Sequence, residues 1–263
     1  MDWGLSNRLA RILKPPHART VMLAVDHGYF LGPTSGLEQP QATIAPLVPY
    51  ADSLMLTRGV LRTSVAPAAD IPVVLRVSGG TSILRELSHE GLTVAMEDAI
   101  RLNASAVTLS IFVGGEGERA SLLNLAKLVD AGQRYGIPVL AVTAVGKEMT
   151  RDARYLGLCC RIAAEIGAHF VKTYYCEGFD EVVRSTPVPV IIAGGKKTPE
   201  ATAVELAWRA MKAGASGVDM GRNIFQSDCP VGMIRAVRAI VHDAAPVGAA
   251  LEIYEQEKSK SRP

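Results

Sequence analysis

The sequence is poor in aromatic residues and in cysteine. Only 5% of its residues are aromatic, so Ala, Val, Leu and Ile must build the core. The four cysteines, Cys159, Cys160, Cys176 and Cys229, show no C-x-x-C spacing. This pattern predicts free thiols in a cytoplasmic protein rather than a disulfide or metal framework.

Long apolar and long basic runs are also missing. No uncharged apolar run approaches the ~18 residues of a membrane span, and the amino-terminal stretch MDWGLSNRLARIL has no secretory layout. Basic and acidic residues are interspersed and give a net charge of +2. We therefore expect neither a membrane partner nor a nucleic-acid partner.

What the sequence does contain is a series of eight short apolar segments rich in β-branched residues. Such near-continuous runs are typical of parallel strands that are covered on both faces. The segments are 20–28, 52–59, 71–80, 105–115, 136–146, 167–175, 186–195 and 214–224.

Helical patterns alternate with these segments, at 118–136, 152–167, 198–214 and 230–243. Gly136 and Gly167 are end signals, Asp152 and Thr198 are candidate caps, and proline opens the last helix. Alternation over a chain of 263 residues predicts an α/β fold, a single-domain (β/α)8 TIM barrel. An open doubly wound sheet is the alternative, but no G-x-G-x-x-G follows the first strand.

The two chain ends carry separate expectations. Residues 1–13 are predicted to form an extra amphipathic helix that covers the barrel floor or an interface, and residues 14–263 form the barrel domain. The final EKSKSRP is expected to be frayed. The stretch 78–88 is predicted to be a long loop with a short helical piece.

The strand AHFVKTYY at 168–175 contains Lys172 among residues typical of a buried strand. A lysine here could guard a sheet edge or extend its amine to water. A closed barrel has no edge, however, and its interior has little bulk water. An inward amine is desolvated and near other cations, which favours its neutral, nucleophilic form. Such an amine can attack a ketone and form a Schiff base.

Glycines follow the last two predicted strands, in AGGKK and DMGRNIFQ. In this fold the loops after strands seven and eight commonly bind phosphate through backbone amides. Gly194, Gly195 and Gly221 let the backbone approach the anion closely, and Arg222 can form a bidentate contact with it. The expected ligand is therefore a phosphorylated small molecule.

Other polar residues end strands on the same face of the barrel. Asp26 is predicted to be a general base or to position substrate hydroxyls, and His27 to shuttle protons. Asp26 could also simply cap a turn. Arg76 and Lys147 are predicted to bind the substrate. No second histidine has ligand spacing relative to His27, so no metal site is expected.

Four stretches resemble the class I, Schiff-base aldolase family that includes archaeal-type fructose-bisphosphate aldolases. They are VMLAVDHGYFLGPTSGLE, KTYY, VIIAGGKK and GASGVDMGRNIFQSD. AVTAVGKEM, RIAAEIGA and TRGVLR resemble in particular the thiolases of this family. The resemblance covers nearly the whole chain.

The resemblance implies a (β/α)8 barrel, Lys172 as the Schiff-base lysine, and phosphate bound around Gly195, Gly221 and Arg222. It also implies a ring-based homo-oligomer, a decamer. Family aldolases carry a general-acid tyrosine near the end of strand five, whereas this chain has none in AVTAVGKEM. That difference favours a thiolase, which uses coenzyme A as co-substrate and no cofactor.

Three functions remain as hypotheses. The first is a thiolase that moves an acetyl group from a phosphorylated dione to coenzyme A and releases dihydroxyacetone phosphate. The second is a class I aldolase that acts on a phosphorylated ketose. The third is a non-catalytic sugar-phosphate binding protein, since this barrel hosts many functions. No binding site for coenzyme A is recognisable in the sequence.

Overall fold

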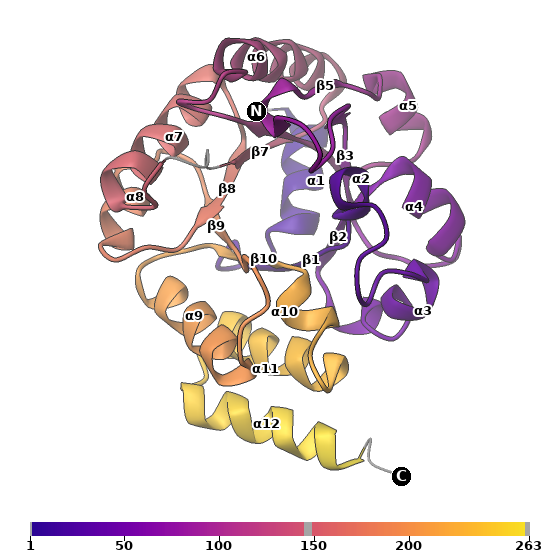
Figure 1. Cartoon of the computed structure of the whole chain (residues 1–263), viewed down its shortest axis with the longest axis vertical. Coiled ribbons are helices and arrows are strands. Elements are labelled where there is room, and N and C mark those ends of the chain that lie inside the picture. The colour runs from indigo at the N-terminus through magenta and orange to yellow at the C-terminus, as the bar shows by residue number, and fades with distance from the viewer. Residues whose placement is uncertain (1, 145–148, 261–263) are drawn as a thin grey trace.

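The computed structural model describes residues 2–144 and 149–260, and its centre is a closed barrel of eight parallel strands (Figure 1). All eight predicted strands are present, and the predicted fold is confirmed. The barrel order is β1-β10-β9-β8-β7-β6-β3-β2. The strands are β1 Thr20–Ala24, β2 Ser53–Thr57, β3 Val73–Arg76, β6 Ala106–Ile111, β7 Val139–Thr143, β8 Phe170–Tyr174, β9 Val190–Ala193 and β10 Gly217–Met220.

Helices surround the barrel and cover the outward faces of the strands (Figure 1). They are α1 Trp3–Ile12, α2 Gly28–Leu31, α3 Pro40–Ile44, α4 Arg58–Ser64, α5 Met96–Arg101, α6 Glu118–Tyr135, α7 Ala153–Ile166, α8 Phe179–Ser185, α9 Glu200–Lys212, α10 Arg222–Phe225, α11 Pro230–Asp243 and α12 Val247–Lys260. Short 3₁₀ helices lie at η1 Val48–Tyr50 and η2 Leu87–His89. No helix in the described part of the chain is long and apolar enough to cross a membrane.

Most of the predicted helix signals are confirmed. Gly136 and Gly167 end α6 and α7 with left-handed φ angles of 66° and 109°, which glycine adopts without steric cost. The Asp152 carboxylate accepts a hydrogen bond from the Tyr155 backbone N–H and caps α7. The Thr198 cap was wrong: α9 begins one residue later than expected, with Pro199 in the cap position.

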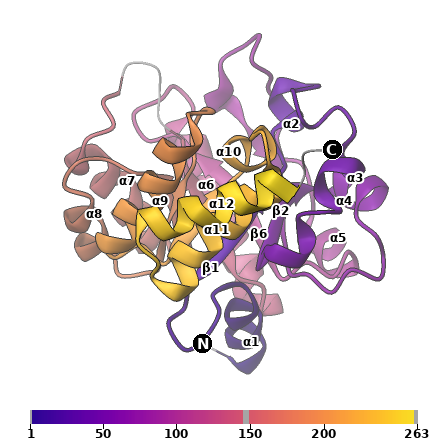
Figure 2. The same ribbon diagram turned by 90° about the horizontal axis from the view of Figure 1, so that it is seen from below.

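The barrel interior is filled in layers, because alternate side chains on each strand point inward. The lower layer is apolar and includes Met22, Met55 and Phe170. Ile12 and Leu13, at the end of α1, pack against the same cluster. Figure 2 shows α1 at the opposite end of the barrel from α2. In this structure the end of the amino-terminal helix therefore packs against the barrel floor.

The carboxyl-terminal segment corrects one expectation. Residues 257–260 are not frayed but form the last turn of α12, which lies beside α11 (Figure 1). Arg235 pairs with Glu257 at 2.5 Å, and Lys258 pairs with Asp228 at 2.8 Å. The loop at 78–92 also holds more structure than expected, because β4 Ser78–Gly79 and β5 Gly91–Leu92 form a small antiparallel hairpin around η2.

Candidate active site

Lys172 lies in the middle of β8 with its side chain inside the barrel. It pairs with Val142 of β7 and Ile191 of β9, so β8 is not an edge strand. It shares its inward face with Phe170 of the apolar layer below, and its side chain is only 9% exposed. The amine is thus held in a buried position at the carboxyl end of the barrel, where active sites of this fold lie.

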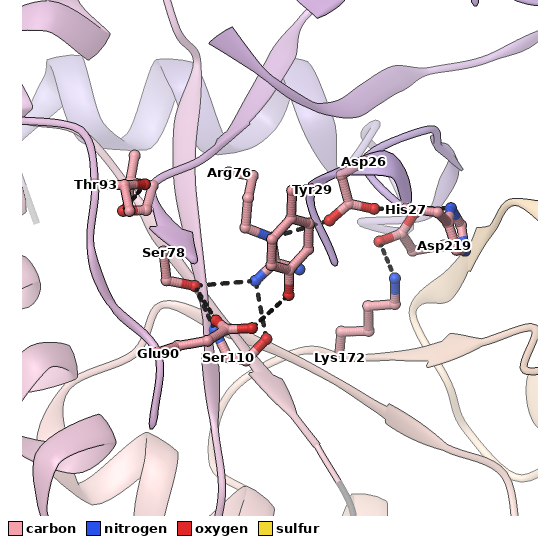
Figure 3. A network of polar contacts seen from close by, with 11 residues as sticks. Asp26, His27, Tyr29, Arg76, Ser78, Glu90, Thr93, Ser110, Lys172 and Asp219 are labelled. Atoms are coloured by element: carbon pink, nitrogen blue, oxygen red, sulfur yellow. Dashed lines mark hydrogen bonds and ion pairs between the residues drawn. The ribbon is translucent and has the colours of Figure 1, made fainter. Parts of the chain in front are cut away.

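Asp219 of β10 is the ion-pair partner of Lys172, and sequence reasoning missed it. Its Oδ2 lies 2.7 Å from the Lys172 Nζ, as Figure 3 shows. Its Oδ1 is buried and has no hydrogen-bond partner among the described residues. Burial raises the pKa of Asp219 to about 6, against the lowering effect of Lys172. A carboxylate with this pKa can exchange a proton with the amine near neutral pH.

A second buried ion pair, Asp26 with Arg76, stands across the barrel from the first. Arg76 Nε donates a hydrogen bond to Asp26 Oδ2 at 2.9 Å, and both residues are buried. Burial alone would raise the pKa of Asp26. The Arg76 guanidinium, with His27 and Lys172, outweighs burial and holds that pKa below its ordinary value. Asp26 is therefore a stable carboxylate, and Arg76 is its ion-pair partner.

His27 follows Asp26 and is held as a neutral imidazole. Burial lowers the pKa of His27 to about 4, although Asp26 opposes this effect. Its Nδ1 lies 4.0 Å from Asp26 Oδ1 and makes no hydrogen bond within the described part of the chain. The ring packs edge-on against Phe225, with 5.8 Å between the ring centroids. The imidazole is thus fixed in place with a free ring nitrogen.

A chain of hydrogen bonds extends from Arg76 to Glu90, away from Lys172 (Figure 3). Arg76 Nη1 donates to Ser110 Oγ at 3.0 Å. Ser78 Oγ and the Tyr29 hydroxyl each donate to the Glu90 carboxylate at 2.6 Å. Tyr29, Ser110 and Glu90 were not predicted as site residues, because 61 residues separate Tyr29 from Glu90 and no sequence spacing reveals their contact.

The predicted phosphate loops lie together at the ends of β9 and β10. Asn223, which is fully buried, joins them: its Nδ2 donates to the Gly194 carbonyl at 2.7 Å, and its Oδ1 accepts from the Thr198 N–H at 2.8 Å. Gly195 has a φ of 71° and open space around its Cα. A side chain on Gly221 would place its Cβ 2.3 Å from the Ala24 carbonyl oxygen, so this position requires glycine.

These groups surround one cavity of about 260 Å³ at the carboxyl end of the barrel. The structure brings together all the predicted site residues that it describes; Lys147 lies outside the described residues. Arg222 lines the cavity, and its buried Nε has no hydrogen-bond partner among the described residues. The lining includes Asp26, His27, Arg76, Lys172, Gly194, Gly195, Asp219, Gly221 and Arg222.

Comparison with known proteins agrees with this geometry. A 3-hydroxy-5-phosphonooxypentane-2,4-dione thiolase of Klebsiella pneumoniae is 60% identical over 259 residues, which cover 98% of this chain and 88% of that protein. The protein of the same name from Escherichia coli K12 is 56% identical, over 98% of this chain and 89% of its own length.

Solved structures give the same fold. A Schiff-base-forming fructose-1,6-bisphosphate aldolase superposes with a TM-score of 0.82 at 25% identity, over 90% of this chain and 100% of that chain. An archaeal fructose 1,6-bisphosphate aldolase gives a TM-score of 0.81 at 25% identity, over 91% and 99%. The family model for DeoC/LacD family aldolases matches residues 20–227. The chain is therefore an enzyme that belongs to the DeoC/LacD family of aldolases.

Proposed function

We propose that this enzyme is a thiolase for 3-hydroxy-5-phosphonooxypentane-2,4-dione. It would transfer the acetyl group to coenzyme A and release dihydroxyacetone phosphate. The observation that carries the proposal is the buried Lys172–Asp219 pair, with 2.7 Å between Nζ and Oδ2. The pair lies between two phosphate-type loops and the Asp26–Arg76 pair. The names of the relatives from Klebsiella and Escherichia supply the substrate.

Lys172 acts first, as the nucleophile. Its Nζ attacks the ketone carbon next to the phosphate-bearing carbon and forms a carbinolamine, which loses water to give an iminium. The amine must lose a proton to attack, and the hydroxyl must gain one to leave. Asp219 supports both transfers, because it is the carboxylate in contact with Nζ and its pKa is about 6.

The phosphate end of the substrate is proposed to bind at the β9 and β10 loops. Gly194, Gly195 and Gly221 leave room for the anion close to the backbone. Arg222 lines the cavity, and its guanidinium has a buried Nε with no hydrogen-bond partner among the described residues. Binding here directs the adjacent ketone towards β8, and it holds the reacting carbon near the amine.

The carbon–carbon bond would break on the side of Asp26 and Arg76. The thiolate of coenzyme A adds to the acetyl carbonyl, and its proton passes to Asp26 or His27. The Arg76 guanidinium stabilises the oxyanion that forms. When this intermediate collapses, the electron pair of the broken bond moves into the iminium and gives an enamine. Acetyl-coenzyme A is the first product.

The remaining steps return the enzyme to its starting state. The enamine takes a proton at the carbon that lost the acetyl group. Water then hydrolyses the iminium, which releases dihydroxyacetone phosphate and the Lys172 amine. The water lost on iminium formation is regained here, so the net reaction joins one dione and one coenzyme A into two products.

The test is product analysis with and without coenzyme A. We expect acetyl-coenzyme A and dihydroxyacetone phosphate in equal amounts, no turnover without the thiol, and a borohydride-trapped adduct on Lys172 with dihydroxyacetone phosphate. Cleavage of fructose 1,6-bisphosphate at a comparable rate would favour the aldolase alternative. The absence of a tyrosine in 139–149 argues against that alternative. The assignment to a family of enzymes argues against a non-catalytic binding protein.

The quaternary structure and the compartment also remain proposals. We propose a ring-based homo-oligomer, a decamer, in the cytoplasm. Trp3 is 78% exposed on α1, and Leu158 is 52% exposed on α7, so apolar surface is available for contacts between copies. The four cysteines are buried and none of them forms a disulfide, which fits a reducing compartment. Light scattering of the purified protein measures the number of subunits.

A further inference from the structure

A second cavity, of about 600 Å³, adjoins the one that contains Lys172. Its lining is mostly small and uncharged, and includes Gly28, Thr57, Gly59, Gly79, Gly80 and Thr93. The first cavity, at about 260 Å³, lies below the usual range of ~300–1,000 Å³ for ligand sites. It therefore leaves little room for a second substrate beside the phosphorylated dione.

The two cavities share one thin wall. Asp26, Tyr29 and Arg76 line both of them. Figure 3 shows Tyr29 and Arg76 between Thr93, which lines the second cavity, and Lys172, which lines the first. Arg76 of this wall lies on β3, which is opposite β9, the strand before Gly194 and Gly195, in the barrel order. A reactant that extends through the second cavity would reach the substrate at the end opposite to its phosphate, where the acetyl group lies.

The outer rim of the second cavity carries positive charge. Arg58 lines the cavity and lies on the same helix as Arg62. Both bind Asp98, as does Arg101. One carboxylate is thus shared by three guanidinium groups, which leaves an excess of positive charge. Arg58 and Arg62 are about half exposed, so both can also contact an anion from solvent.

We propose that this second cavity binds coenzyme A, with the pantetheine arm inside it and the phosphates at Arg58. The arm is slender and uncharged, and most of the residues that line the cavity are small and uncharged. The arm ends in the thiol that must cross the Asp26–Tyr29–Arg76 wall. The nucleotide end is anionic, which complements the positive charge of the rim. This assignment rests on the proposed thiolase function and gives that function its missing acceptor site.

The first test narrows the cavity by Gly79→Val. A Cβ at Gly79 would lie 3.3 Å from Tyr29 Cδ2, so a branched side chain fills the space beside the wall. Gly91 is the matched control, because it pairs with Gly79 in the β4–β5 hairpin and a Cβ there meets nothing within 4 Å. We expect Gly79→Val to lower kcat/KM for coenzyme A at least tenfold, since the arm loses its channel. Gly91→Val should leave it unchanged.

The second test concerns the rim and compares coenzyme A with pantetheine, which lacks the phosphates. Arg58→Ala should lower kcat/KM for coenzyme A about tenfold, the value of one hydrogen bond to a charged group. It should leave kcat/KM for pantetheine unchanged. Arg101→Ala is the control, because Arg101 also binds Asp98 but does not line the cavity.

In both tests the borohydride adduct on Lys172 with dihydroxyacetone phosphate monitors the first cavity and should form as in the wild type. If wild-type turnover needs no thiol, the result contradicts the proposed thiolase function and, with it, the proposed coenzyme A site. If turnover needs coenzyme A but Gly79→Val and Arg58→Ala behave like their controls, the function stands. The thiol then enters by another route and the assignment of the second cavity is overturned.

Discussion

Replacing Asp219 by asparagine tests the role of a site residue that was not predicted from the sequence. The change keeps the shape of the side chain but removes the carboxylate that lies 2.7 Å from the Lys172 amine. Asparagine cannot accept the proton that the amine must lose before it attacks a ketone. General acid–base catalysis contributes about 10²–10⁴-fold to a rate, so we expect iminium formation to slow by at least ~10²-fold at neutral pH.

The pH dependence makes this prediction specific. Burial raises the pKa of Asp219 to about 6, although Lys172 opposes the effect. Asp219 accepts a proton only when it is ionised, so its contribution is complete well above pH 6 and falls about tenfold per pH unit below that value. The wild-type rate should therefore decline on the acidic side of pH 6. The change of slope near pH 6 should be absent from Asp219→Asn, which is slow throughout.

The assay is the initial rate of borohydride-trapped adduct with dihydroxyacetone phosphate, measured by intact mass from pH 5 to pH 8. Asp52→Asn is the control, because Asp52 is also a buried carboxylate with side-chain partners, Arg238 and His242, but does not line the site. That variant should keep the wild-type pH profile. If Asp219→Asn traps adduct at the wild-type rate with the same acidic decline, Asp219 is not the proton acceptor and the reasoning is refuted.

Three further predictions follow from the same contacts. Lys172→Ala should retain the fold but give no trapped adduct by mass spectrometry. Gly221→Ala would push a Cβ to 2.3 Å from the Ala24 carbonyl oxygen; we expect a rise in KM for the phosphorylated substrate and weaker inhibition by inorganic phosphate in steady-state assays. Burial raises the pKa of Asp52, but its hydrogen bonds, the one from His242 foremost, hold that pKa below its ordinary value of 3.8. Asp52→Asn should therefore lower the urea midpoint at neutral pH. The difference in midpoint between the variant and the wild type should shrink as pH falls below about 4.

The fold was readable from the sequence because each element carries its own local signal. The eight strands are continuous apolar runs, and Gly136 and Gly167 end the helices after which they stand. Lys172 was readable for a related reason. A lysine in an apolar strand often lies at the edge of a sheet, where it prevents unwanted pairing. A closed barrel has no such edge, so this explanation does not apply to Lys172.

The partners within the site could not be read in the same way, because they depend on contacts across the barrel. Asp219 is a charged residue in an apolar strand, as Lys172 is. It stands in the same stretch as Gly221 and Arg222, however, and that stretch is typical of a phosphate-binding loop. Arg76 was predicted to bind substrate, and the sequence does not reveal that it also pairs with Asp26, 50 residues away in the chain. At the carboxyl terminus, charge suggested fraying, but ion pairs to α11 and to the loop before it hold the last turn of α12.

The two buried ion pairs are better explained by function than by stability. Removing two charges from water costs several kcal/mol per ion, and replacing a buried pair with apolar residues is often neutral or stabilising by ~1–4 kcal/mol. The layer just below shows that this barrel can be filled with apolar side chains, including Met22 and Phe170. Stability therefore does not require Asp26–Arg76 and Lys172–Asp219 in the layer above. Their place at the carboxyl end, around one cavity, is explained by the reaction that we propose for them.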